Sequence, residues 1–168
     1  MRLAVTDACI FIDLYLLGII ERFFELDIEV HTTYDVLNEL YEHQRKPLFR
    51  YQRSGKLTVH LLTHADRIRL YDFSCPRSLS ETDKTVIYLA LRIEALLLSS
   101  DKAVRRFAKQ QSIEYHGMIW ILDQLLEKEL LTPLEASGKL TSLVAGNFLY
   151  QNNAELMLEV YKRLKKWK

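Results

Sequence analysis

Short apolar runs alternate with longer amphipathic segments along most of this chain. The runs at residues 3–5, 28–31, 57–61, 95–99 and 113–115 have the length and residue types of strands, although periodicity alone does not exclude a helix at 95–99. The segments between them are predicted to be helical: residues 10–24 as one helix broken near Gly18 or as two short ones, 34–41 and 80–93 with an apolar face, 63–73 as an exposed helix and 101–110 as a basic one. Strands that alternate with helices predict an α/β fold in which a parallel sheet is covered on both faces.

The remainder of the chain is predicted to be helical. Residues 117–129, 134–144 and 154–168 have helical patterns, and Thr132-Pro133 is typical of an N-cap followed by a first helical residue. Residues 146–153 are predicted to form a loop. Because no long linker divides the chain, we expect residues 1–168 to form a single domain, with residues 130–168 as a C-terminal helical extension.

Composition narrows the class of protein without selecting a partner. The net charge of +1 gives no global attraction to nucleic acid, so any such binding must use a local basic patch. The two cysteines, Cys9 and Cys75, have no metal-binding spacing and are read as reduced thiols. The sequence has neither a signal peptide nor an apolar run of the roughly 18 residues that a membrane span needs. We therefore expect a cytoplasmic protein with no membrane segment.

Four acidic residues occupy comparable positions in the predicted fold. Asp7 follows the first strand, and Asp101 follows the strand at 95–99. Glu39 lies beside the apolar stripe of the helix at 34–41, and Asp83 lies in the first turn of the helix that begins at Ser80. Taken singly, Asp7, Asp83 and Asp101 are better explained as helix-capping residues, and Glu39 as a side chain that pairs with a neighbour on its helix or is solvated. Right-handed crossovers, however, can bring all four to the carboxyl edge of the sheet.

A cluster of carboxylates at that edge has clear chemical consequences. Two like charges about 4 Å apart repel by about 4 kcal/mol at an effective dielectric constant of 20, so the cluster requires a cation or raised pKa values. Oxygen ligands without Cys or His partners favour hard ions such as Mg²⁺ or Mn²⁺. These ions suit the hydrolysis of phosphodiester bonds, because they polarise a phosphoryl oxygen and lower the pKa of a bound water.

The stretches at residues 5–12, 32–40, 79–90 and 96–105 resemble, in order and spacing, the motifs of the PIN-domain family of metal-dependent ribonucleases. This family includes the VapC-like toxins of prokaryotic toxin–antitoxin pairs. The resemblance implies a three-layer α/β/α sandwich with a parallel sheet of about five strands. It also implies an RNA substrate, a homodimer and an antitoxin protein as partner.

The resemblance assigns roles to individual residues. The family's catalytic acids correspond to Asp7, Glu39, Asp83 and Asp101, of which Asp7, Asp83 and Asp101 would ligate Mg²⁺ or Mn²⁺. Glu39 would ligate the metal or orient the water, and the family's supporting hydroxyl residue corresponds to Ser99. A further acid that often follows the last motif is absent, since Val104 and Arg105 stand there. That absence leaves open whether one metal ion or two would bind.

Two basic clusters are candidates for binding RNA. Lys102, Arg105 and Arg106 recur on the helix after Asp101, and Arg50 and Arg53 form the second cluster. Such residues can contact phosphates independently of sequence, and Tyr51 in the second cluster could stack on a base. The alternative for each cluster is an ordinary solvated helix face.

The sequence leads to one main hypothesis and two alternatives. The main hypothesis is a Mg²⁺- or Mn²⁺-dependent endoribonuclease, toxin-like in character. The first alternative is a PIN-like scaffold, weakly active or inactive, that acts by binding protein or RNA. The second is a receiver-like signalling domain, which ranks last because the strand at residues 57–61 is not followed by the phosphoacceptor Asp that it needs. Kinase-type phosphate loops and nucleophile elbows are absent as well.

Overall fold

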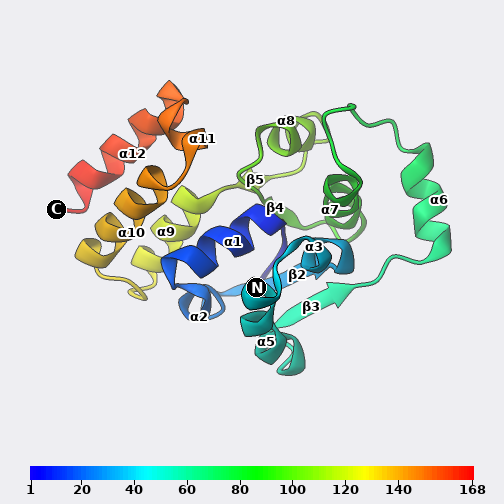
Figure 1. Ribbon diagram of the computed structural model, residues 1–168, viewed down its shortest axis with the longest axis horizontal. Coiled ribbons are helices and arrows are strands. Elements are labelled where there is room, and N and C mark those ends of the chain that lie inside the picture. The colour runs from blue at the N-terminus through cyan, green and yellow to red at the C-terminus, as the bar shows by residue number, and fades with distance from the viewer.

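Five parallel strands form one sheet at the centre of the molecule. The computed structural model describes all 168 residues. The strands are β1 (Arg2–Thr6), β2 (Ile28–Thr33), β3 (Leu57–His60), β4 (Leu96–Leu98) and β5 (Tyr115–His116), in the spatial order β3-β2-β1-β4-β5 (Figure 1). Every neighbouring pair is parallel. The predicted α/β class and five-stranded sheet are therefore confirmed.

Helices cover both faces of the sheet, because its strands are continuous runs of apolar residues that need burial on both sides. One face is covered by α7 (Glu81–Arg92) and α8 (Lys102–Gln110), with α6 (His64–Asp72) packed against α7. The other face is covered by α1 (Ala8–Leu17), α2 (Ile20–Phe23) and α9 (Met118–Glu127). The central strand residues Val5 and Leu97 are fully buried between these layers.

Local sequence determines where several of these helices begin and end. Gly18 adopts the left-handed conformation (φ 66°) that ends α1, which places the predicted break at this residue. Thr33 caps α3 (Tyr34–Glu39), which is followed by α4 (Glu42–Arg45), the 3-10 turn η1 (Lys46–Leu48) and α5 (Phe49–Arg53). The basic segment around Pro47 is thus helical on both sides of the proline, and the helix predicted at 34–41 ends earlier, at Glu39.

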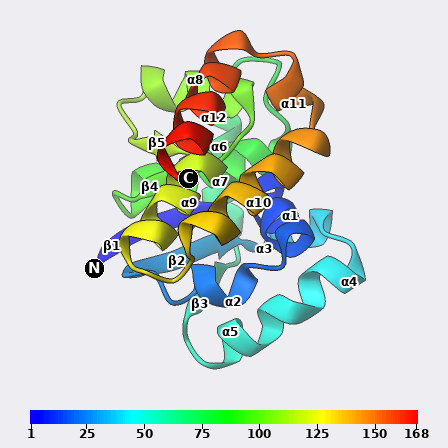
Figure 2. The same ribbon diagram turned by 90° about the vertical axis from the view of Figure 1, so that its left-hand side faces the viewer.

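The chain after residue 130 forms a helical layer outside α9. It comprises α10 (Pro133–Ala145), α11 (Phe148–Gln151) and α12 (Ala154–Lys166), and α10 packs on both α9 and α1 (Figure 2). The prediction of a loop at residues 146–153 is wrong in part, because α11 occupies its centre. Burial explains this short helix: Tyr150 is only 2% exposed, and packing of its ring holds the turn in place.

Ion pairs fasten this outer layer to the sheet domain. Arg163 of α12 binds Asp123 of α9, with 3.0 Å between Nη2 and Oδ2. Arg22 of α2 binds Glu135 of α10 and donates a hydrogen bond to the carbonyl oxygen of Leu130.

No helix in the structure is both long and apolar enough to cross a membrane.

Candidate active site

Three of the four predicted acids lie at the carboxyl edge of the sheet. Asp7 directly follows β1, and its backbone N–H donates to the carbonyl oxygen of Leu98, at the end of the neighbouring strand β4 (3.0 Å). Asp101 is the N-cap of α8, which follows β4, and Asp83 lies in the first turn of α7. The charges of Asp83 and Asp101 both act on Asp7 and raise its pKa. The parallel crossovers thus place these three residues at the same edge of the sheet.

Asp7 is the most buried of the three acids, with only 4% of its surface exposed. One carboxylate oxygen accepts the N–H of Ala8 at 2.7 Å, and the other accepts the hydroxyl of Ser99 at 2.8 Å. Burial raises the pKa of Asp7 to about 6, against the lowering effect of these hydrogen bonds. The side chain is therefore both an N-cap and a poorly solvated charge.

Ser99 links two of the acids. Its hydroxyl donates to Asp7 and accepts the backbone N–H of Asp101 at 3.1 Å, and the residue is completely buried. The sulfur of Cys9 lies 3.7 Å from both the Asp7 carboxylate and the Ser99 hydroxyl. Burial and the nearby Asp7 charge raise the pKa of the Cys9 thiol to about 12, so the thiol stays protonated at neutral pH.

Asp83 and Asp101 each use one carboxylate oxygen as a helix cap. Asp83 accepts the N–H of Ser80 at 2.8 Å in a capping box, and Asp101 accepts the N–H of Val104 at 2.9 Å. The second oxygen of each carboxylate makes no hydrogen bond within the protein. Burial raises the pKa of Asp83, and the charge of Asp101 adds to the rise. The capping and the functional interpretations of these acids are therefore compatible.

Glu39 is placed apart from the other three acids. It is the last residue of α3, is exposed, and makes neither a hydrogen bond nor an ion pair. Its charge is not among those that shift the pKa of Asp7. No group of three or more His, Cys, Asp and Glu side chains lies close enough to hold a metal ion. The expected compact cluster of four carboxylates is consequently not assembled in this structure, because three acids are held by helix caps and the fourth stands at a helix end.

Comparison with known proteins identifies the fold family. A protein-family model described as a PIN domain matches residues 3–166. The chain belongs to the PIN-domain family. The match extends to the end of α12, so the C-terminal helices lie within it. No curated protein matches this sequence.

Two solved structures resemble this PIN domain. A domain of a functionally unknown protein from Methanocaldococcus jannaschii is 19% identical with a TM-score of 0.48, and the match covers 70% of this chain and 91% of that one. A PilT N-terminus domain protein from Sulfolobus solfataricus is 15% identical with a TM-score of 0.45, and the match covers 75% of this chain and 95% of that one.

The acids of this PIN domain fit a divalent cation in their chemistry. None of the ion pairs in the structure includes Asp7, Asp83 or Asp101, so no protein cation balances their charge. The donors are carboxylate oxygens, which hard divalent ions prefer. In addition, the buried hydroxyl of Thr6, the residue before Asp7, has no hydrogen-bond partner in the protein.

The two predicted basic clusters have different positions. Lys102, Arg105 and Arg106 of α8 lie beside Asp101 and line a hollow against the C-terminal helices. Arg50 and Arg53 belong to α5, which leads into the amino end of β3 and so lies toward the opposite edge of the sheet.

The suggestion that Tyr51 stacks on a base is wrong. Tyr51 is 6% exposed and stacks instead on Phe24, with 4.0 Å between ring centroids. Arg50 is bound to the Tyr51 hydroxyl and to Glu21. Tyr51 therefore serves the packing of α5, and Arg50 takes part in a surface ion pair.

Several residues near the site were not predicted to be functional from the sequence. Asp13 is 8% exposed on α1, makes no hydrogen bond, and has a pKa that burial raises to about 6. Its spacing from Asp7 makes it visible in the sequence, but only packing shows that it faces inward. Ser100, Asn153 and Glu155 line the hollow beside α8, and the two residues of the C-terminal segment have no sequence pattern that marks them.

Proposed function

We propose that this PIN domain is a Mg²⁺- or Mn²⁺-dependent endoribonuclease that hydrolyses phosphodiester bonds in single-stranded RNA. The main support is that Asp7, Asp83 and Asp101 lie at one edge of the sheet, where the charges of Asp83 and Asp101 raise the pKa of Asp7, the charge of Asp101 raises the pKa of Asp83, and no protein cation balances the three. Binding of a divalent cation at such a site is favourable, because it relieves the repulsion between the carboxylates. Membership of the PIN-domain family, whose members are typically nucleases, supports this reading.

Each residue has a distinct role in the proposed reaction. Asp7, Asp83 and Asp101 would hold the metal, which supplies charge stabilisation at the phosphoryl group and lowers the pKa of a bound water. Ser99 positions the acids, because its hydroxyl bonds both Asp7 and the backbone of Asp101. Glu39, at the exposed end of α3, is proposed to orient the attacking water from the solvent side.

The basic residues of α8 would hold the substrate. Lys102, Arg105 and Arg106 make no ion pair within the protein and lie directly after Asp101 in the chain. Phosphates of a bound strand can therefore contact them without breaking an ion pair. Binding through such contacts weakens as the salt concentration rises.

The test compares two buried acids of the same N-terminal segment. Asp7→Asn is expected to abolish cleavage of single-stranded RNA in Mg²⁺ or Mn²⁺, whereas Asp13→Asn should retain the wild-type rate. Asp13 is a matched control because its pKa is raised to about the same value, yet it is not coupled to Asp83 or Asp101. Glu39→Gln should reduce the rate by less than Asp7→Asn does. Wild-type rates in Asp7→Asn would refute the proposal.

One observation favours an alternative function. Because no group of acids is preassembled for a metal ion, the domain could instead act as a PIN-like scaffold with little or no turnover. The scaffold predicts that Mn²⁺ leaves the thermal stability of the protein unchanged. The nuclease predicts a Mn²⁺-dependent rise in stability that Asp7→Asn removes.

The biological setting is proposed from the family. We propose a toxin-like role in which the domain forms a homodimer and a small antitoxin protein inhibits it. Exposed aromatic residues near α3, Tyr34 at 49% and Tyr41 at 71%, offer apolar contact area for such a partner. Analytical ultracentrifugation would test the dimer. Growth arrest on expression of wild type but not of Asp7→Asn would test the toxic activity.

A further inference from the structure

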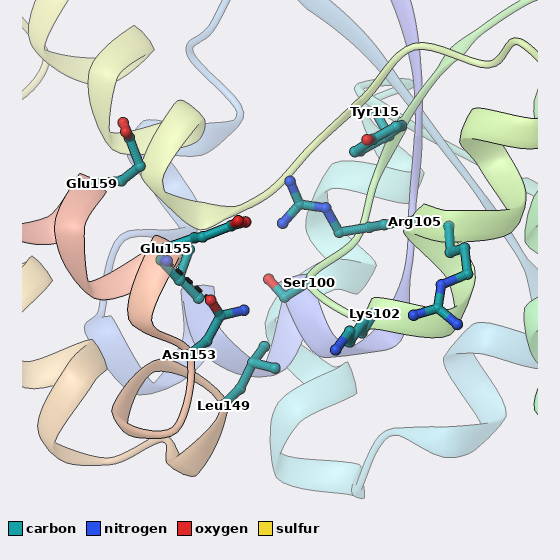
Figure 3. A pocket seen from close by; sticks show the side chains of 10 residues that line it. Ser100, Lys102, Arg105, Tyr115, Leu149, Asn153, Glu155 and Glu159 are labelled. Carbon is teal, nitrogen blue, oxygen red and sulfur yellow. Dashed lines mark hydrogen bonds between the residues drawn. The ribbon is translucent and has the colours of Figure 1, made fainter.

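A hollow of about 300 Å³ lies between α8 and the C-terminal helices α11 and α12, and the residues on either side of Asp101 in the chain, Ser100 and Lys102, line it. Its volume is at the lower end of the range for ligand sites. One wall comes from the start of α8 and the other from the segment around Asn153, two parts of the chain that are about 50 residues apart in the sequence (Figure 3). The hollow therefore exists only because the C-terminal helices pack against the sheet domain.

The wall formed by α8 is cationic. Lys102, Arg105 and Arg106 line it, and none of the three is in an ion pair. The guanidinium of Arg105 lies over the ring of Tyr115, 5.1 Å from its centroid, which holds this side chain at the mouth of the hollow. Gly117 gives it room: a Cβ there would lie 3.3 Å from Nη1 of Arg105 and 3.6 Å from Oγ of Ser100.

The floor of the hollow holds an unsatisfied polar atom. Ser100 is 6% exposed, and its hydroxyl makes no hydrogen bond with normal geometry. Ser100 does act on the Tyr150 hydroxyl, since it lowers the pKa of that group, although burial raises the same pKa more strongly. In Figure 3 the Ser100 oxygen points across the hollow toward α12. Because a buried hydroxyl without a partner costs free energy, a ligand oxygen at this position would be stabilising.

The opposite wall has a different character. Leu149 and Leu156 supply apolar surface. Asn153 caps α12 through its side-chain oxygen, which accepts the N–H of Leu156 at 3.0 Å, and this leaves its amide N–H groups free to donate. The carboxylate of Glu155 is exposed and makes no hydrogen bond or ion pair, whereas nearby Glu159 is bound to Lys162. This wall thus presents apolar contact, a free donor and two free acceptor oxygens.

We propose that this hollow binds one unpaired guanosine nucleotide of the RNA, next to the phosphodiester bond that is cut. The inference rests on the proposed function. The nucleotide's phosphate would contact Lys102 and Arg105 and accept the hydroxyl of Ser100. Guanine alone among the RNA bases offers two adjacent donors, N1–H and N2–H₂, that match a carboxylate such as Glu155. Its O6 accepts from Asn153, and the splayed base lies against the two leucines.

Position supports this assignment. Ser100 and Lys102 flank Asp101 in the chain, so a phosphate held by them lies at the same edge of the sheet as Asp101. A single strand is needed, because only an unpaired base exposes its Watson–Crick edge to Glu155. The C-terminal helices then provide base selection for a site whose chemistry lies on the sheet.

The test measures binding in EDTA, so that it does not depend on cleavage. Fluorescence anisotropy would compare short labelled oligouridines that carry one central guanosine, one adenosine or no substitution. Wild type should bind the guanosine oligomer roughly fivefold or more tightly than the other two, as expected for one bidentate base contact. Glu155→Gln should remove this preference and leave affinity for plain oligouridine unchanged or stronger, because a negative charge is lost.

A matched pair of substitutions on α8 tests the phosphate contact. Arg105→Gln should weaken binding of all three oligomers by about tenfold, the expected effect of a charged hydrogen bond. Lys109→Gln removes the same charge from an exposed position on α8 outside the hollow and should have little effect. Equal affinity of wild type for all three oligomers, or a guanosine preference that survives Glu155→Gln, would overturn the inference. Absence of metal-dependent cleavage with the guanosine preference intact would overturn only the nuclease assignment.

Discussion

The burial of Asp7 makes a quantitative prediction about stability. Its pKa rises from 3.8 to about 6 on folding, which corresponds to about 3 kcal/mol at 1.36 kcal/mol per pH unit. Between these two pH values the native state binds more protons at this residue than the unfolded state does. The unfolding free energy contributed by Asp7 therefore falls as pH rises from about 4 to 6 and stays low above it.

Substitution of Asp7 by Asn should raise the free energy of unfolding at neutral pH by about the amount that the buried charge costs. Asn is as good an N-cap as Asp, so the hydrogen bond from Ala8 can be kept while the buried charge is removed. In EDTA at pH 8 we expect Asp7→Asn to be more stable than wild type by about 3 kcal/mol, and at pH 4 to be nearly equal to it. Urea denaturation at both pH values measures the difference. Asp13→Asn should show the same pH-dependent gain, since burial raises its pKa to a similar value.

Added Mn²⁺ should affect the stability of the two variants differently. A ligand present at 100 times its dissociation constant stabilises the native state by about 2.7 kcal/mol. Wild type and Asp13→Asn should gain stability in Mn²⁺, while Asp7→Asn should not. If Asp7→Asn is less stable than wild type at pH 8 in EDTA, the buried-charge reasoning is refuted. If Mn²⁺ stabilises Asp7→Asn as much as wild type, the metal assignment fails.

Three further substitutions test the fold that supports the site. Leu97→Ala removes a fully buried side chain from β4 and should lower the unfolding free energy by about 2–5 kcal/mol, measured by urea denaturation. Ser80→Ala breaks the capping box with Asp83 and should cost about 1 kcal/mol in the same assay, with Asp83 less well held. Arg163→Met removes the ion pair with Asp123 and should make α12 more susceptible to limited proteolysis at unchanged circular dichroism, and unchanged cleavage would contradict a fastening role for this pair.

Much of the fold and part of the site followed from local patterns. The spacing of apolar residues along the chain predicted the parallel α/β sheet. Capping residues such as Ser80 and Thr132 predicted helix starts that the structure contains. These features depend on residues within a few positions of one another, where backbone geometry is fixed. For the same reason the positions of Asp7 and Asp101 at strand ends could be read from sequence.

The sequence by itself thus determined the order of elements, the class of the sheet and the edge at which the acids gather. Only the tertiary structure decided that Glu39 stands apart, that Tyr51 is buried against Phe24, and that α11 replaces a predicted loop around Tyr150. The hollow between α8 and α12 likewise depends on packing. Periodicity reports which face of an element is apolar, but distances between elements far apart in the chain depend on how their side chains fit together.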